Sequence, residues 1–134
     1  MQTILTDKLV RSHRPGYHLG KTEPVPEPVV VEWMASARNQ GVASIICLLD
    51  EQHLKLYRDC AGGQGLVQAY TAAGFTVAHI PVKDHCSPPV NAEQMQRILD
   101  AYEMLPKPVL VHCSAGVDRT GAVVRHVVAR EEKR

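Results

Sequence analysis

Three short apolar runs, each followed by a segment of helical periodicity, constrain the fold of this chain most. The runs cover residues 42–49, 76–82 and 108–112 and are rich in valine, isoleucine and leucine. Continuous apolar runs of this length are typical of strands that are buried on both faces of a sheet. Strands that alternate with helices predict an α/β fold, with a central, mainly parallel sheet of four to five strands and helices on both faces.

The predicted helices have recognisable beginnings and ends. Pro28 suits a first helical position, and Gly41 stands where that helix needs a C-terminal cap. Asn91 and Gln94 have the spacing of a capping box at the start of a later helix. The other predicted helices begin at Leu66 and at about Arg119, and two short strands, 3–5 and 9–12, are predicted ahead of all of them, joined by a turn at Asp7-Lys8.

Length and composition limit the class of protein. The chain has 134 residues, fewer than the ~150 of an average domain, so residues 1–134 are predicted to form a single domain. A hydrophobic content of 45% with 22% charged residues excludes a disordered chain. The net charge of +1 gives no general attraction to nucleic acid, and no apolar run approaches the ~18 residues of a membrane span. Without an export signal or a CxxC pair, the four cysteines indicate reduced thiols and a cytoplasmic protein with no nucleic-acid or membrane partner.

The topology predicts where function lies. Parallel strands joined by right-handed crossovers place their C-terminal ends at one edge of the sheet, where ligands bind. The loops after Leu49, Val82 and His112 therefore share this edge.

The third of these loops has the composition of an anion site. The sequence from His112 to Gly121 reads HCSAGVDRTG, so a cysteine leaves a strand and an arginine opens a helix. The backbone N–H groups of a tight turn that enters a helix form a cradle for a tetrahedral dianion, and small residues let the oxygens come close. The guanidinium of Arg119 can hold two phosphate oxygens at once. The residues predicted to bind the phosphoryl group are Ser114, Ala115, Gly116, Val117, Asp118 and Arg119; residues 113–119 are called the cradle below.

The same groups make Cys113 a candidate nucleophile. Converging N–H dipoles and the charge of Arg119 stabilise a thiolate, Thr120 could donate its hydroxyl to the sulfur, and His112 could orient the loop. A lone cysteine is more often an inert core residue. Here six positions match H-C-x-x-G-x-x-R-T-G together, and a chance match in this length is on the order of one in a million. We therefore assign the loop a function.

The loop and two further stretches resemble the cysteine-dependent protein tyrosine phosphatases, in particular the small dual-specificity-like members. The further stretches are Arg11-Ser12 with Arg14-Pro15-Gly16, and Ile80-Pro81-Val82-Lys83-Asp84. The resemblance implies a phosphatase-like fold and hydrolysis of phosphotyrosine, with phosphoserine or phosphothreonine as further substrates, in a phosphorylated protein or peptide. It implies a cysteinyl-phosphate intermediate and no cofactor.

By this resemblance Cys113 is the nucleophile, Arg119 the phosphate clamp and Asp84 the general acid. The residues also support Asp84 independently, because it follows a parallel strand at the edge where Cys113 is expected, on a loop of residues 83–89. We call this segment the acid loop. A carboxyl there can protonate the leaving oxygen and then activate water. Asp50 is the main rival, since it also ends a parallel strand.

Two features depart from the family pattern. Asp118 stands directly before Arg119, where the commonest family loop has glycine, and the lysine of lipid-specific relatives is missing from the cradle. The C-terminal helices that relatives carry after the loop helix are expected to be missing, together with a polar residue that positions water.

Three alternative functions remain open at this point. They are a phosphopeptide-binding module without turnover, a rhodanese-like sulfur carrier and a phosphoinositide phosphatase. Steady turnover separates hydrolysis from binding, and Thr120-Gly121 with the Asp84 loop weighs against the sulfur carrier. Tyr17 and His18 could line the cleft, and the oligomeric state stays open. No metal is predicted, because no ligand-type pairing is found for His13, His18, His53, His79, His85, His112 or His126.

Overall fold

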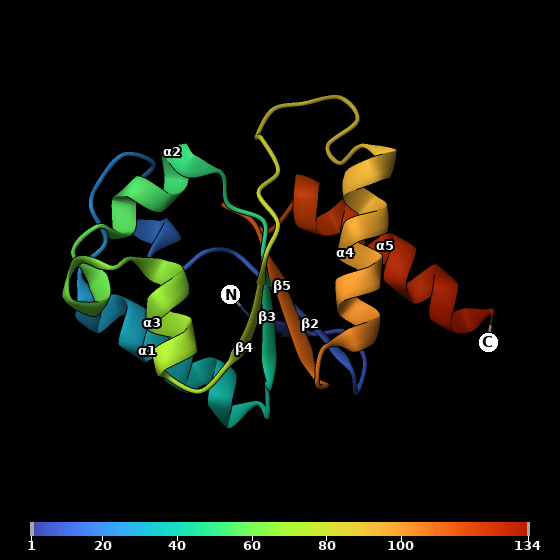
Figure 1. The fold of residues 1–134 in the computed structure, drawn as a ribbon, viewed down its shortest axis with the longest axis horizontal. Coiled ribbons are helices and arrows are strands. Elements are labelled where there is room, and N and C mark those ends of the chain that lie inside the picture. Colours follow the sequence, from blue (N-terminus) through green and yellow to red (C-terminus); the bar gives the residue numbers. More distant parts are fainter. Residues whose placement is uncertain (1, 134) are drawn as a thin grey trace.

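The computed structural model describes residues 2–133 and has a five-stranded sheet at its centre (Figure 1). The strand order is β1-β2-β5-β3-β4; β1 pairs with β2 antiparallel, and the other neighbours are parallel. This confirms the predicted α/β fold with a mainly parallel sheet. The strands are β1 (Thr3–Ile4), β2 (Leu9–Ser12), β3 (Ser44–Cys47), β4 (Thr76–His79) and β5 (Val109–His112).

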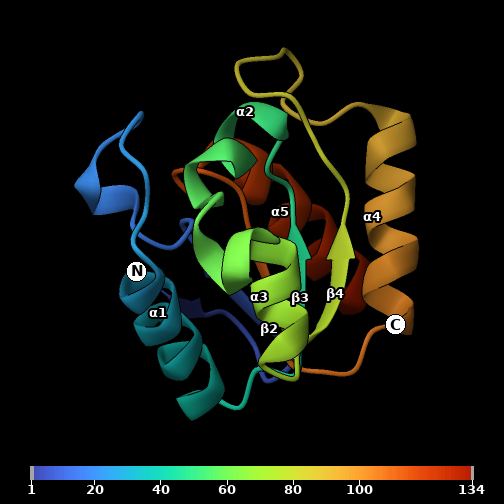
Figure 2. The same ribbon diagram turned by 60° about the vertical axis from the view of Figure 1, so that its left-hand side comes forward.

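Helices cover both faces of the sheet, as predicted. In Figures 1 and 2, α1 (Glu27–Asn39) and α3 (Leu66–Ala72) lie on one face, and α4 (Ala92–Met104) and α5 (Asp118–Glu132) lie on the other. The capping box at the start of α4 is present, with the Asn91 side chain accepting from the Gln94 backbone N–H at 2.8 Å. Short helical turns complete the chain: η1 (Tyr17–Leu19), α2 (Glu51–Leu54), η2 (Lys55–Tyr57) and η3 (Cys60–Gly63).

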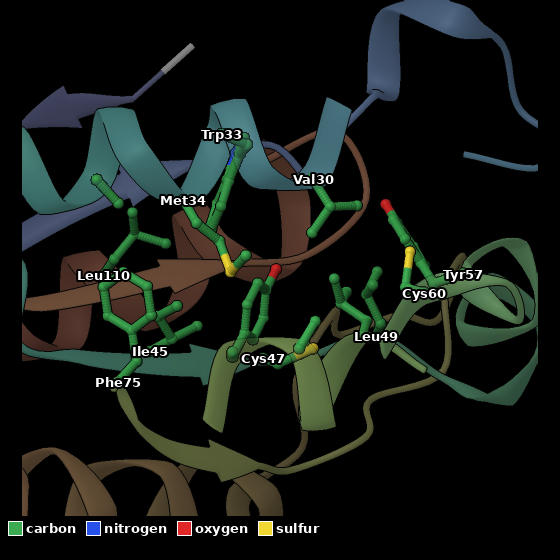
Figure 3. Packing of buried hydrophobic residues seen from close by; sticks show 14 of the residues in the cluster. Val30, Trp33, Met34, Ile45, Cys47, Leu49, Tyr57, Cys60, Phe75 and Leu110 are labelled. Carbon is green, nitrogen blue, oxygen red and sulfur yellow. The ribbon is translucent and has the colours of Figure 1, made fainter. Parts of the chain in front are cut away.

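The central strands are buried on both faces because their side chains alternate between two apolar clusters. Ile45 and Leu110 point toward α1 and pack near Trp33 (Figure 3). Ile46 and Val111, their neighbours in the chain, belong to the cluster under α4 and α5. This double burial explains why these strands read as continuous apolar runs.

Strand β4 differs from its prediction. The run 76–82 is predicted to be a buried strand, but β4 ends at His79, Thr76 is exposed and the other three residues are half-buried. The reason is position, because β4 lies at the edge of the sheet and pairs only with β3 among the described strands.

Two helical details also differ. Helix α1 begins at Glu27 after Pro26, so Pro28 occupies the second helical position rather than the first. Either position suits proline, because the first N–H groups of a helix have no intrahelical partner. The turns between residues 51 and 63 were not predicted, since three or four residues are too few for a helical period to show.

Four loops, rather than the predicted three, meet at the C-terminal edge of the sheet. Strand β2 is parallel to β5, with Ser12 opposite His112, so the loop after Ser12 joins the loops that follow β3, β4 and β5. In Figure 1 this edge is at the top, where the loop after β4 arches above the start of α5 and leads to α4. Within residues 2–133, no helix is long and apolar enough to cross a membrane.

Candidate active site

The cradle lies between the end of β5 and the first turn of α5. Cys113 is 2% exposed, and the backbone N–H of Gly116 donates to its Sγ at 3.3 Å. Helix α5 begins at Asp118, so its free N–H groups and positive dipole end belong to the cradle. The Arg11 guanidinium donates to the Gly116 carbonyl at 2.6 Å and holds the turn from β2. The local sequence therefore folds as predicted: a buried strand, a tight turn and a helix start.

Gly116 is required by the close packing of this turn. Its φ is +76°, in the left-handed region. A Cβ atom at this position would lie 2.5 Å from the Ser12 carbonyl oxygen and 2.8 Å from the His13 nitrogen. Both contacts are with backbone, which cannot rotate away.

We expect Gly116→Ala to lower kcat/KM by about 10²-fold, because the clash displaces the cradle from the reacting groups. Steady-state kinetics with para-nitrophenyl phosphate measure the effect. Gly41→Ala is the matched control, since Gly41 also has a positive φ, of +83°, but nothing lies within 4 Å of its added Cβ. Equal activity losses in the two variants would contradict this account of Gly116.

Arg119 connects the cradle to the acid loop. Its side chain is 2% exposed, and Nη1 donates to the Val82 carbonyl at 2.7 Å. Its Nε lies 3.5 Å from Oδ1 of Asp84. The carboxylate of Asp84 and the guanidinium of Arg119 therefore face each other, with Cys113 on the wall of the same cavity.

Asp50 and Asp84, the two candidates for the general acid, lie in different environments. Asp50 caps α2, where its side chain accepts the His53 N–H at 3.2 Å and the Asp84 N–H at 3.4 Å. Burial opposes ionisation of Asp50, but these two hydrogen bonds together with the charges of His53 and Arg119 lower the pKa of the carboxyl. Asp84 lines the cavity with its side chain 26% exposed, whereas Asp50 is not among the lining residues.

The cavity at this edge has a volume of about 360 Å³. The predicted residues Ser114, Ala115 and Asp118 line it. Val117 does not and is 61% exposed, and Gly116 is buried and is not among the lining residues. From the loop after β2, Tyr17 lines the cavity as the sequence suggested, but His18 does not; the wall that α2 provides was not identified from the sequence. The lining residues are Tyr17, Lys21, Thr22, Gln52, His53, Asp84, His85, Cys113, Ser114, Ala115, Asp118 and Arg119.

His112 supports the cradle from below, as expected. It is fully buried, with Nδ1 2.9 Å from the Cys113 carbonyl and Nε2 2.9 Å from the Tyr70 hydroxyl. A carbonyl can only accept, so Nδ1 carries the proton and Nε2 accepts from Tyr70. Trp33 packs edge-on against the same ring at 5.5 Å. Tyr70 and Trp33 have no signal in the sequence beyond a helical apolar face, which core residues share.

Burial lowers the pKa of His112 to about 4. Its unfolded pKa is 6.5, so between these values the unfolded state binds the proton and the folded state does not. The contribution of His112 to stability is therefore complete above pH 6.5 and is lost as the pH falls toward 4, by up to ~3 kcal/mol. Denaturant unfolding at pH 7, 6 and 5 should show a shallower pH dependence for His112→Gln than for the parent. Identical slopes would contradict a buried neutral His112.

Thr120 does not make the predicted contact. Its hydroxyl is buried and has no hydrogen-bond partner among the described residues, and no bond to the Cys113 sulfur is formed. The structure instead places Arg14 against Ser114, a contact that the sequence did not predict.

In the described part of the chain, no group of three or more histidine, cysteine and acidic side chains is placed to hold a metal ion.

A family model of known proteins matches most of the chain. Residues 20–132 match a family model described as "Polymorphic toxin system, DSP-PTPase phosphatase". A search of curated proteins found no match.

Solved structures share the fold. A DUF442 protein from Shewanella putrefaciens CN-32 has a TM-score of 0.68 at 20% identity, over 99% of this chain and 70% of that one. The PTP-2 phosphatase of Cydia pomonella has a TM-score of 0.66 at 17% identity, over 99% and 71% of the two chains. The catalytic core of the PP-IP phosphatase SIW14 from S. cerevisiae has a TM-score of 0.63 at 13% identity, over 96% and 64%.

Proposed function

Because the chain belongs to the DSP-PTPase phosphatase family of polymorphic toxin systems, we propose that it hydrolyses phosphotyrosine in proteins or peptides through a cysteinyl-phosphate intermediate. One observation carries this proposal. Cys113 and Arg119 from the cradle and Asp84 from the acid loop line a single cavity at the C-terminal edge of the sheet.

In the first step the Cys113 thiolate attacks phosphorus, and the bond from phosphorus to the ester oxygen breaks. Asp84 donates its proton to that oxygen, so the alcohol or phenol leaves neutral. The cradle N–H groups and the fork of Arg119 hold the phosphoryl oxygens, which requires the guanidinium to exchange its 3.5 Å contact with Asp84 for the substrate.

In the second step water attacks phosphorus, and the bond to sulfur breaks. The ionised Asp84 takes the proton from this water, so inorganic phosphate and the thiolate are released. Gln52 and His53 line the cavity from α2, and they are the groups available there to orient the water.

The burial of the nucleophile supports phosphotyrosine over phosphoserine. Cys113 is 2% exposed on the wall of a cavity of about 360 Å³, and Tyr17 forms part of the same wall. A phenyl ring carries its phosphate farther from the peptide backbone than the single methylene of serine does. The longer side chain therefore suits a recessed sulfur.

A second candidate substrate class is a phosphorylated inositol. Lys21 lines the cavity in addition to Arg119, so a second phosphate could find a cationic partner. The similarly folded SIW14 is named as a PP-IP phosphatase.

Steady-state assays with para-nitrophenyl phosphate, a phosphotyrosine peptide, a phosphoserine peptide and inositol hexakisphosphate test the proposal. We expect sustained turnover, highest kcat/KM for the phosphotyrosine peptide, and inhibition by vanadate, which resembles the phosphoryl group in transfer. A single burst without turnover would favour a binding module, and sulfur transfer from thiosulfate would favour the rhodanese-like alternative. Preference for the inositol phosphate would move the substrate class to phosphorylated inositols.

A further inference from the structure

Arg14 is a buried cation without an acidic partner. Its side chain is 0% exposed, the lowest value among the charged residues described. None of the ion pairs formed by residues 2–133 includes it. Burying an unpaired charge opposes folding unless another group compensates it. A cation kept in this position therefore calls for a functional explanation.

The hydrogen bonds of Arg14 go only to neutral acceptors. Its Nε donates to the Ser114 hydroxyl at 3.2 Å, Nη1 to the Tyr57 hydroxyl at 3.2 Å and Nη2 to the Gly20 carbonyl at 2.8 Å. Its guanidinium also lies 5.6 Å from the centre of the Tyr17 ring. These contacts satisfy N–H groups without neutralising the charge, so the positive potential remains at this place.

The acceptors connect Arg14 to two walls of the cavity. Ser114 directly follows Cys113 in the cradle, and it also accepts the Arg14 backbone N–H through its carbonyl, at 2.8 Å. Gly20 belongs to the segment 15–22, which carries Tyr17, Lys21 and Thr22 to the cavity. One side chain therefore fixes the cradle relative to segment 15–22, which forms another wall of the cavity.

The Tyr57 hydroxyl accepts a hydrogen bond from the guanidinium of Arg14. The same hydroxyl donates to the Pro15 carbonyl at 2.6 Å while it accepts from Arg14, so its single proton is committed. Burial raises the pKa of Tyr57 above its usual range, which keeps it a neutral phenol rather than a counterion.

The charge of Arg14 reaches the cavity. Burial is the largest cause that lowers the pKa of His53, and the charges of Arg119 and Arg14 lower it further, against the opposing effect of Asp50. His53 lines the cavity. A group bound there experiences the positive potential of Arg14 as well.

From this arrangement we propose that Arg14, which is buried beside the residues that line the cavity and is not one of them, is a positioning residue. It fixes the cradle through Ser114, and its unpaired charge is compensated by the bound phosphoryl dianion. The inference rests on the proposed function in that a phosphoryl group is the ligand of the cradle. The proposal adds to the site a residue that lies outside the cradle motif. Arg14 belongs to the loop after β2, 100 positions before Ser114 in the chain.

Binding of inorganic phosphate and alkylation of Cys113 test this without any turnover. In Arg14→Gln the side chain keeps hydrogen-bonding groups and loses the charge, and the dissociation constant for phosphate should rise about tenfold or more, as expected for loss of a charge-assisted contribution. In Arg14→Lys the charge stays, and phosphate affinity should remain within about threefold of the parent. Arg97→Met, which removes an exposed cation of α4, is the control for overall charge.

Alkylation gives a second, independent readout of the potential at the sulfur. Iodoacetate is an anion and iodoacetamide is neutral, so the ratio of their rates on Cys113 reports local charge. This ratio should fall in Arg14→Gln and stay near the parental value in Arg14→Lys. Equal loss of phosphate affinity in both variants would make Arg14 a packing residue only, and unchanged affinity in Arg14→Gln would overturn the proposal. Neither outcome bears on whether Cys113, Arg119 and Asp84 hydrolyse the ester, which the turnover assays decide.

Discussion

Replacement of Cys113 by serine is expected to abolish turnover and to leave the binding of inorganic phosphate close to normal. The serine hydroxyl is not ionised at neutral pH and is a far weaker nucleophile than a thiolate. The N–H groups of the cradle and the guanidinium of Arg119 do not depend on the sulfur and persist in the variant. Turnover of para-nitrophenyl phosphate, and phosphate affinity measured by calorimetry, separate the two effects.

Cys86→Ser is the matched control for Cys113→Ser. Cys86 is the exposed cysteine, lies on the acid loop and is not among the residues that line the cavity. Its replacement is expected to leave kcat and KM within about twofold of the parent, as surface substitutions usually do. Hydrolysis by Cys113→Ser within tenfold of the parent would remove Cys113 from the mechanism.

Replacement of Asp84 by asparagine is expected to lower kcat roughly 10²–10⁴-fold, the usual contribution of a positioned general acid. The amide keeps the shape of the side chain but carries no proton for the leaving oxygen, so the alkaline limb of the pH–rate profile should flatten. The loss should be large for a phenol that leaves poorly and small for para-nitrophenol, which leaves without a proton. A series of aryl phosphates measured across pH provides both tests.

Asp50→Asn is the control for Asp84→Asn, because it changes the same charge at the same edge of the sheet. Asparagine is also a good N-cap, so α2 should keep its start and the free energy of unfolding should change by less than ~1 kcal/mol. Asp50 also accepts the Asp84 N–H, so a moderate fall in kcat with a preserved bell-shaped profile is expected. If Asp50→Asn instead flattens the alkaline limb while Asp84→Asn keeps a full bell, the general acid is Asp50.

The class of fold and the place of the cradle could be predicted from the sequence because both depend on local patterns. An apolar run such as 108–112 has to be buried on two faces, and this favours a parallel sheet wherever its neighbours lie. The turn between Cys113 and Arg119 depends on small residues and a helix start within a few positions. The Asn91 capping box is local in the same sense, and the structure contains it.

The composition of the cavity could be predicted only in part, because most of its walls come from segments that are distant in sequence. Ser114, Ala115 and Asp118 line it as expected, since they belong to the motif. Gln52 and His53 reach it on α2, a turn of four residues that leaves no periodic signal. The sequence favoured Asp84 over Asp50 through its loop and the family resemblance, but it did not show that Asp50 caps α2.

What the sequence by itself determined is therefore the set of elements and the chemistry of one loop, both of which depend on neighbours in the chain. The tertiary structure alone decided which residues meet. The parallel pairing of β2 with β5 buries Arg14 against Ser114, and the edge position of β4 leaves Thr76 exposed. It also decided that Asp50 caps a helix while Asp84 faces Arg119. The physical reason is that burial and charge at a site are set by strand order and long-range contacts, which no local pattern of residues encodes.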